Sequence, residues 1–189
     1  SEKILHVQRP PLAITIPSKD GTIFLDVGAT SRDECNPEML LEFGILGYYY
    51  AHLVGKRAPT IGILNNGTED EKGTKLTKAA NMLYTAYVNK YGLFEYCGFV
   101  EGWQLFEGGA SKPDIVVTDG FTGNVVLKAM EGTAKYIESI IEDTYKKNIF
   151  TMMAGLIAKA SGVFSTIKQE LNPDRYTGAH YLGIKKPFI

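Results

Sequence analysis

Cysteine and histidine are scarce in this sequence, and neither is arranged as a metal or redox motif. The two cysteines, Cys35 and Cys97, form no CxxC pair and have no neighbouring histidine. This argues against a disulfide framework and a zinc site, and favours a reducing, cytoplasmic compartment. His6, His52 and His180 are scattered, so a histidine triad has little support. We predict no metal ligands and no cofactor, and leave a magnesium requirement open because no compact carboxylate cluster is evident.

Net charge and long apolar runs are also lacking. Lys and Arg number 20 against 21 Asp and Glu, which gives a net charge of -1 and no global field to attract nucleic acid. The first residues lack a basic segment followed by a long apolar one, and no uncharged run reaches transmembrane length. We therefore expect a cytoplasmic protein that is neither exported by a standard signal nor membrane-spanning, with no nucleic-acid partner.

The glycine-rich motifs of nucleotide enzymes are missing too. The sequence has no G-x-x-x-x-G-K-[ST] loop and no G-x-G-x-x-G after an apolar strand pattern. Neither an NTPase nor a dinucleotide oxidoreductase is therefore well supported.

Short apolar β-branched runs alternate with longer amphipathic ones, which is typical of βα units around a largely parallel sheet. We expect strands at residues 12–16, 22–27, 61–64, 96–100 and 115–118, and helices from about residues 37, 71, 125 and 149. Asn36 and Pro37 are the expected cap and first residue of the first helix. The second opens with a predicted capping box over residues 68–71. The sequence thus predicts one α/β domain over residues 1–189, with a helical protrusion at about 125–171.

The segment DGFTGN at residues 119–124 joins an apolar run to the third helix pattern. A glycine-bearing turn at a helix N-terminus can hold an anion through backbone N–H groups and the helix dipole. The alternative is that Gly120 and Gly123 only permit a tight turn, with Asn124 or Thr122 as an ordinary N-cap. The acidic residues at 69–71 would repel an anion, so 119–124 is the better phosphate site.

Residues 149–167 form a wide apolar helical stripe with few acidic groups. Core packing or contact with a second copy of the chain is the expected role of such a stripe. Peripheral contact with a membrane surface is the alternative.

Several short motifs occur together in an order that resembles the bacterial phosphate acyltransferase family (PlsX). They are residues 9–13, 25–29, 62–69, 72–73, 100–102, 119–124, 127–128, 131–132 and 176–179. The resemblance implies an enzyme that forms acyl phosphate from acyl carrier protein thioesters and inorganic phosphate, early in phospholipid synthesis. It also implies a homodimer and a three-layer α/β/α fold similar to phosphotransacetylase and isocitrate dehydrogenase. Family members are considerably longer, so this chain looks like a part that lacks an N-terminal segment. Thr30, where Asn is usual, is one of several departures.

Phosphate attack on a thioester needs an anion site, a cation and donors to the developing oxyanion, but no nucleophilic side chain. As substrate-binding residues we predict the turn with its Thr122 hydroxyl, together with Asp26, which is equally a local cap. As catalytic residues we predict two cations and one orienting amide. The predicted site residues are Asp119, Gly120, Thr122, Gly123, Asn124 and Asp26 for binding, and Lys72, Lys128 and Asn65 for catalysis.

Three alternatives remain. Either lysine can be an ordinary solvated side chain. For an acyl-enzyme route, Cys35 in a polar loop is a better nucleophile than Cys97, which we expect to pack as a small hydrophobe. Finally, the chain can be a non-catalytic domain that binds acyl carrier protein or dimerises. Binding to that acidic protein predicts a basic patch, for which the candidates are Lys146, Lys147, Lys159, Lys168, Lys185 and Lys186.

Overall fold

The computed structural model describes residues 7–18, 20–107, 112–171 and 178–184. Its centre is a six-stranded sheet in the order β4-β3-β5-β2-β1-β6. The strands are β1 (Leu12–Ile16), β2 (Thr22–Leu25), β3 (Thr60–Leu64), β4 (Glu95–Val100), β5 (Ile115–Val117) and β6 (His180–Tyr181). Strands β4, β3, β5 and β2 run parallel, while β1 is antiparallel to both of its neighbours. The first five strands coincide closely with the predicted ones; the short β6 was not predicted.

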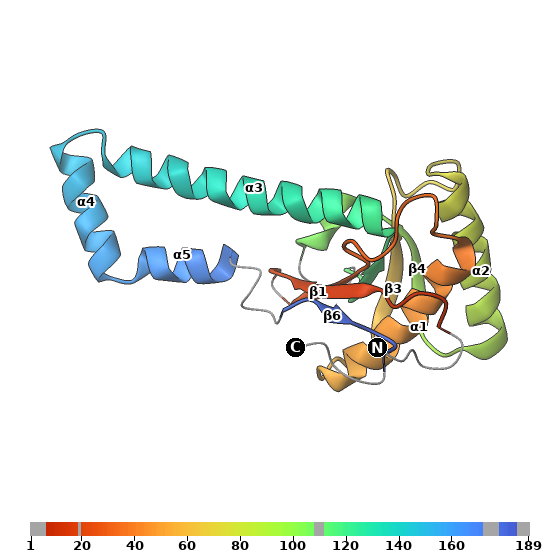
Figure 1. Ribbon diagram of the computed structural model, residues 1–189. Coiled ribbons are helices and arrows are strands. Elements are labelled where there is room, and N and C mark those ends of the chain that lie inside the picture. Colours follow the sequence, from red (N-terminus) through yellow and green to blue (C-terminus); the bar gives the residue numbers. More distant parts are fainter. Residues whose placement is uncertain (1–6, 19, 108–111, 172–177, 185–189) are drawn as a thin grey trace.

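Helical elements cover both faces of the sheet (Figure 1). Helices α1 (Pro37–Leu53) and α2 (Lys75–Tyr91) pack on one face, where the core includes Phe43 and Tyr84. The 3-10 helix η1 (Gly102–Leu105) and the beginning of α3 (Gly120–Tyr145) pack on the other. Alternate side chains of the buried strands supply both cores, as the pleat of a sheet requires. The predicted three-layer α/β/α fold with a largely parallel sheet is confirmed.

Helix α1 begins at Pro37 as predicted, and Asn36 Oδ1 accepts the Met39 N–H at 2.8 Å. The predicted start of the second helix was wrong. Helix α2 begins at Lys75, after a reciprocal cap in which the N–H of Thr77 donates to Thr74 Oγ1 at 3.1 Å. The reason is Gly73, whose φ of +95° lies outside the helical range, so a helix cannot continue through it from residue 71.

Helix α3 has 26 residues, which corresponds to about 39 Å, and it extends beyond the sheet (Figure 1). Helices α4 (Ile149–Ala160) and α5 (Val163–Leu171) follow it and turn back beneath it. They are separate helices because Gly162 has a φ of +81°. We call residues 133–171 the arm; it comprises the second half of α3, together with α4 and α5. Among the described residues, no helix is long and apolar enough to cross a membrane.

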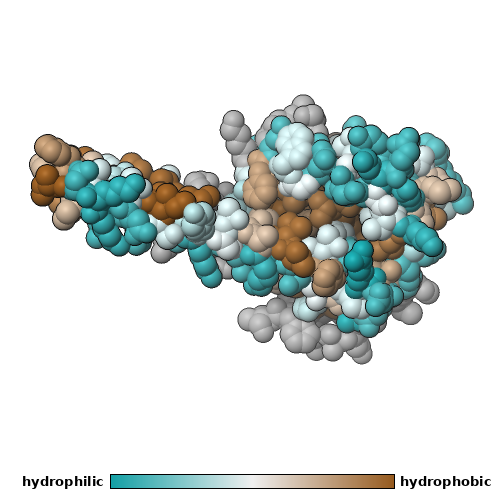
Figure 2. Space-filling view, turned by 90° about the horizontal axis from the view of Figure 1, so that it is seen from above, coloured by the Kyte–Doolittle hydropathy of each residue, from teal (hydrophilic) through white to brown (hydrophobic). Residues whose placement is uncertain are grey.

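The arm exposes much of its apolar surface. Figure 2 shows this apolar surface at the tip of the arm and further along it. On α4, Phe150 is 79% exposed and Ile157 is 69% exposed, although both are large apolar side chains. Surfaces of this kind are typical of contacts with a protein or lipid partner rather than with water.

Candidate functional site

The site lies where three neighbouring parallel strands end. Strand β5 pairs with β2 on one side and β3 on the other, so the loops that follow these strands emerge at one edge of the sheet. Asp26 follows β2, Asn65 follows β3, and the 119–124 segment follows β5. The carboxyl edge of an open parallel sheet is where ligands bind in this class of fold. The predicted residues are thus gathered by topology from three distant parts of the chain.

Asp26 is fully buried and has an unusual backbone conformation, with a φ of +70°. Its Oδ1 accepts the Ala29 N–H at 2.7 Å. Its Oδ2 accepts both the N–H of Thr30 at 3.2 Å and the Thr30 hydroxyl at 2.5 Å. Burial raises the pKa of the carboxyl group, although these hydrogen bonds act in the opposite direction. Of the two predicted roles, local cap and site group, these contacts describe the first.

The N-terminus of α3 is capped by Asp119, not by Asn124 or Thr122 as the sequence suggested. Asp119 Oδ1 accepts the Thr122 N–H at 2.9 Å, and Oδ2 accepts the Thr122 hydroxyl at 2.7 Å. The helix therefore begins at Gly120 rather than Val125. The N–H of Gly120 donates to the Thr30 hydroxyl at 3.0 Å. Among the described residues, no partner accepts the N–H of Phe121, which leaves this donor for a ligand.

Gly120 and Gly123 serve close packing rather than a tight turn. Neither has a positive φ, and both lie in the first turn of α3. A Cβ at Gly123 would lie under 3.0 Å from the carbonyl oxygen of Asp26, and one at Gly120 would lie 2.6 Å from the backbone nitrogen of Thr30. The helix end thus rests directly on the backbone of the 26–30 loop, and only glycine permits that approach.

Asn124 completes the contact between the same two segments. Its Nδ2 donates to the Val27 carbonyl at 3.1 Å, and a Cβ at Gly28 would lie 3.1 Å from this nitrogen. Unlike Asp26, both Asn124 and Gly28 are exposed, so they form the solvent-facing rim of the site.

Asn65 organises the neighbouring loop. Its Nδ2 donates to the Gly67 carbonyl at 3.0 Å, and its Oδ1 accepts the Thr77 hydroxyl at 3.3 Å. The amide is therefore engaged in holding residues 65–74 against α2. Lys72 is exposed within that loop, before α2 rather than in its first turn as predicted.

Lys128 is one helical turn beyond Asn124 and is exposed. Its Nζ forms an ion pair with Glu131 Oε2 at 2.8 Å. An exposed pair of this kind is weak, so the lysine remains able to exchange its partner. The structure thus joins Asp26 and residues 119–124 in direct contact. It places Asn65 and Lys72 on the adjacent loop, and Lys128 further along α3.

The expectation that Cys35 is the more reactive cysteine was wrong. Cys35 is only 8% exposed because it packs into the core, and burial raises the pKa of its thiol to about 12. The thiol is therefore protonated at neutral pH and unsuited to act as a nucleophile. Cys97 was expected to pack as a small hydrophobe. The residue is exposed, but its thiol donates to the Ile61 carbonyl at 3.2 Å, and burial of the thiol raises its pKa to about 11.

Thr30 hydrogen-bonds to two of the predicted site residues, although the sequence did not single it out. In the sequence, Thr30 stood out only because the related family usually has Asn at this position. The available signal was its position four residues after Asp26 in a loop with a glycine, because Asp and Thr side chains often close such turns together. That its hydroxyl would also meet Gly120, 90 residues away, could not be read from the sequence.

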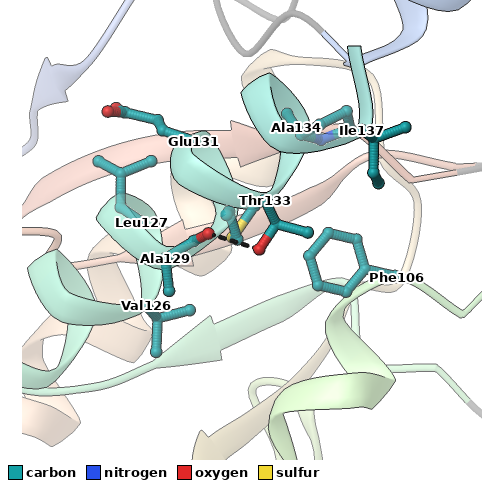
Figure 3. Close-up of a pocket in the computed structure, with 10 residues that line it drawn as sticks. Phe106, Val126, Leu127, Ala129, Glu131, Thr133, Ala134 and Ile137 are labelled. Carbon is teal, nitrogen blue, oxygen red and sulfur yellow. Dashed lines mark hydrogen bonds between the residues drawn. The ribbon is translucent and has the colours of Figure 1, made fainter. Parts of the chain in front are cut away.

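An apolar groove of about 410 Å³ follows the site along α3 (Figure 3). Residues of α3, including Val126, Met130 and Ile137, line it together with Phe106 and Pro17. Its few polar groups are largely satisfied, since the Thr133 hydroxyl donates to the Ala129 carbonyl at 2.8 Å. The groove can therefore accept a hydrocarbon group more readily than a polar one.

The predicted basic patch is described only in part. Lys146, Lys147 and Lys159 are exposed on the arm, and Lys146 lies 3.6 Å from Glu142. The side chain of Lys168 and residues 185–186 lie outside the described part of the structure. Acidic residues are interspersed on α3, while α4 contains none.

Comparison with known proteins identifies relatives across nearly the whole chain. Proteins named phosphate acyltransferase are 41% identical over 184 residues in Thermosipho africanus, 38% over 190 in Helicobacter hepaticus and 41% over 182 in Methylococcus capsulatus. These matches cover 97%, 99% and 95% of this chain, but 53%, 53% and 50% of the respective relatives. The chain thus spans about half the length of the relatives it matches. The family model for "fatty acid synthesis protein" matches residues 1–189. The predicted resemblance is confirmed, and the chain belongs to the fatty acid synthesis protein family.

Proposed function

We propose that this chain is part of a phosphate acyltransferase that converts acyl carrier protein thioesters and inorganic phosphate into acyl phosphate. A phosphate oxygen would attack the thioester carbonyl carbon, the carbon–sulfur bond would break, and the thiol of the carrier protein would leave. The observation that carries this proposal is the convergence of the α3 N-terminus with the loops after β2 and β3. The relatives named phosphate acyltransferase support the same assignment.

The geometry suggests which groups meet the phosphate. The N–H of Phe121 and the positive end of α3 supply donors and a favourable dipole. However, the carboxylates of Asp26 and Asp119 lie at the same helix end, so the anion needs compensating charge. Lys72 is the cation on the neighbouring loop, and Lys128 can supply a second one by leaving Glu131.

The groove along α3 provides a place for the acyl chain. Between Val126 and Ile137 the helix rises by about 16 Å, at about 1.5 Å per residue. A bilayer core of about 30 Å holds two facing acyl chains, so one chain extends about 15 Å. The apolar lining and this length fit a fatty acyl group whose thioester lies toward the N-terminus of α3.

We assign the arm to contact with a second copy of the chain. Its exposed apolar side chains, including Phe150 and Leu156, are too many for a solvated surface. Analytical ultracentrifugation of a Phe150→Asp, Leu156→Asp variant should show a shift from dimer to monomer. If the wild type is monomeric and instead sediments with anionic vesicles, the arm contacts membrane surfaces.

Release of acyl phosphate, trapped with hydroxylamine, tests the reaction directly. Palmitoyl acyl carrier protein and inorganic phosphate would be supplied to this chain and to a protein of the relatives' full length. Lys72→Ala should lower kcat/KM for phosphate by about ten- to a hundredfold if its charge offsets the anion. Exposed Lys78, on α2, provides the matched control. Carrier-protein binding without turnover in either length would refute the enzyme and favour the non-catalytic domain.

A further inference from the structure

The hydroxyl of Thr30 lies between two parts of the site that are far apart in the sequence. It donates to Asp26 Oδ2 at 2.5 Å and accepts the N–H of Gly120 at 3.0 Å. The side chain is only 4% exposed, so water does not compete for either bond. A hydroxyl that donates to a carboxylate becomes a better acceptor, because neighbouring hydrogen bonds polarise one another. The buried carboxylate thereby acts on the first N–H group of α3.

This arrangement decides which donors at the helix end remain for a ligand. Thr30 engages the N–H of Gly120, and Asp119 engages the N–H of Thr122. The N–H between them, from Phe121, has no acceptor among the described residues. The hydrogen bonds of Gly120 and Thr122 hold the backbone on both sides of Phe121, and they therefore fix the direction in which the Phe121 N–H points.

We propose that Thr30 is a positioning residue, which aims the Phe121 N–H at the phosphate through its bond to Gly120. The inference rests on the proposed function, since it concerns the phosphate subsite of that reaction. Without the hydroxyl, the glycine contacts would still hold α3 near the 26–30 loop, so the chain would fold. The helix end would nevertheless lose one of its two anchors and would turn away from its working direction.

Three variants separate positioning from a purely structural role. Thr30→Val removes the hydroxyl with little change of shape, whereas Thr30→Ser retains it. Thr22→Val is the matched control, because Thr22 is also fully buried and its hydroxyl donates to the Leu105 carbonyl at 3.1 Å. Thr22 begins β2 and so lies at the opposite edge of the sheet from the site.

In the intact protein, Thr30→Val should lower kcat/KM for phosphate by about ten- to a hundredfold, since small misplacement of a reacting group has effects of this size. Thr30→Ser should recover most of the loss, and Thr22→Val should leave this value within about twofold of the wild type while lowering thermal stability similarly. If Thr30→Val and Thr22→Val have the same kcat/KM, the hydroxyl is only structural and the proposal is overturned.

A second measurement does not depend on turnover. In protein labelled with 15N-phenylalanine, the amide resonance of Phe121 should shift during titration with inorganic phosphate. The shift should persist in Thr30→Ser and be lost or need much more phosphate in Thr30→Val. A wild-type resonance that does not respond to phosphate would overturn the positioning role. A response without any acyl phosphate formation would instead retain the phosphate subsite and refute the proposed reaction.

Discussion

Replacing Gly123 by alanine is the sharpest test of how the site is built, because α3 also contains its own control. Gly123 and Gly132 both belong to this helix, Gly123 at the end of its first turn and Gly132 in its interior. A Cβ at Gly132 would meet nothing within 4 Å, whereas one at Gly123 would meet the Asp26 carbonyl oxygen under 3.0 Å and Thr118 Cγ2 at 3.0 Å. Replacing glycine by alanine therefore adds a methyl group in open space at Gly132 and against the backbone of Asp26 at Gly123.

The expected energies have opposite signs. Alanine is favoured over glycine in a helix interior by about 1 kcal/mol, so Gly132→Ala should stabilise the protein by up to that amount. At Gly123 the same gain is opposed by overpacking, which costs about 1–3 kcal/mol. The upper end applies because the obstacle is a backbone carbonyl that cannot rotate away. We expect Gly123→Ala to be less stable than the wild type by about 2 kcal/mol.

Urea unfolding at constant protein concentration measures both differences, provided that the m-value is unchanged. The two variants should differ by about 3 kcal/mol. If Gly123→Ala proved as stable as Gly132→Ala, the close approach of α3 to the 26–30 loop would be wrong. The prediction that these glycines form a turn that holds an anion would then regain support.

Three further predictions concern the site and the core. Burial raises the pKa of the Asp26 carboxyl group above its ordinary value of 3.8. The protonated group therefore contributes stability fully below pH 3.8, and this contribution is lost as the pH rises through the pKa of the folded state. The free energy of unfolding should accordingly fall more steeply with rising pH in the wild type than in Asp26→Asn. Iodoacetamide should modify Cys97 slowly in the folded protein and Cys35 more slowly still, because burial raises the thiol pKa to about 11 for Cys97 and to about 12 for Cys35; equal rates would contradict the deeper burial of Cys35. Ala134→Phe, which fills the groove, should reduce turnover of long acyl donors far more than of short ones, whereas an equal loss for both would exclude the groove as the acyl site.

Much of the fold could be predicted because the strand patterns are local. The apolar runs at β1 to β5 are short and bounded by turn residues, and Asn36 with Pro37 is an unambiguous helix start. The start of α2 was predicted wrongly because residues 68–71 match a capping-box pattern. Only the φ of Gly73 excludes that helix, and a backbone angle is not visible in the sequence.

The sequence predicted which residues would lie close together, but not the contacts that they make. The resemblance and the position of the loops identified Asp26, Asn65 and the 119–124 segment, which do lie at one edge of the sheet. Sequence reasoning could not show that Thr30 joins two of these segments, because the bond spans 90 residues. It also misjudged Cys35, since polar neighbours in the sequence do not reveal that a side chain turns into the core.

The segment at 119–124 shows why a glycine-rich turn before a helix is an ambiguous signal. Its features divide among separate physical tasks: Asp119 caps the helix, the two glycines allow contact with the 26–30 loop, and Asn124 binds the Val27 carbonyl. The groups that take part in these contacts are no longer available to bind an anion. What remains for a ligand is the Phe121 N–H and the helix dipole, opposed by two nearby carboxylates. The phosphate binding that we propose here therefore requires cations from outside the segment, and Lys72 and Lys128 are the candidates whose replacement tests this.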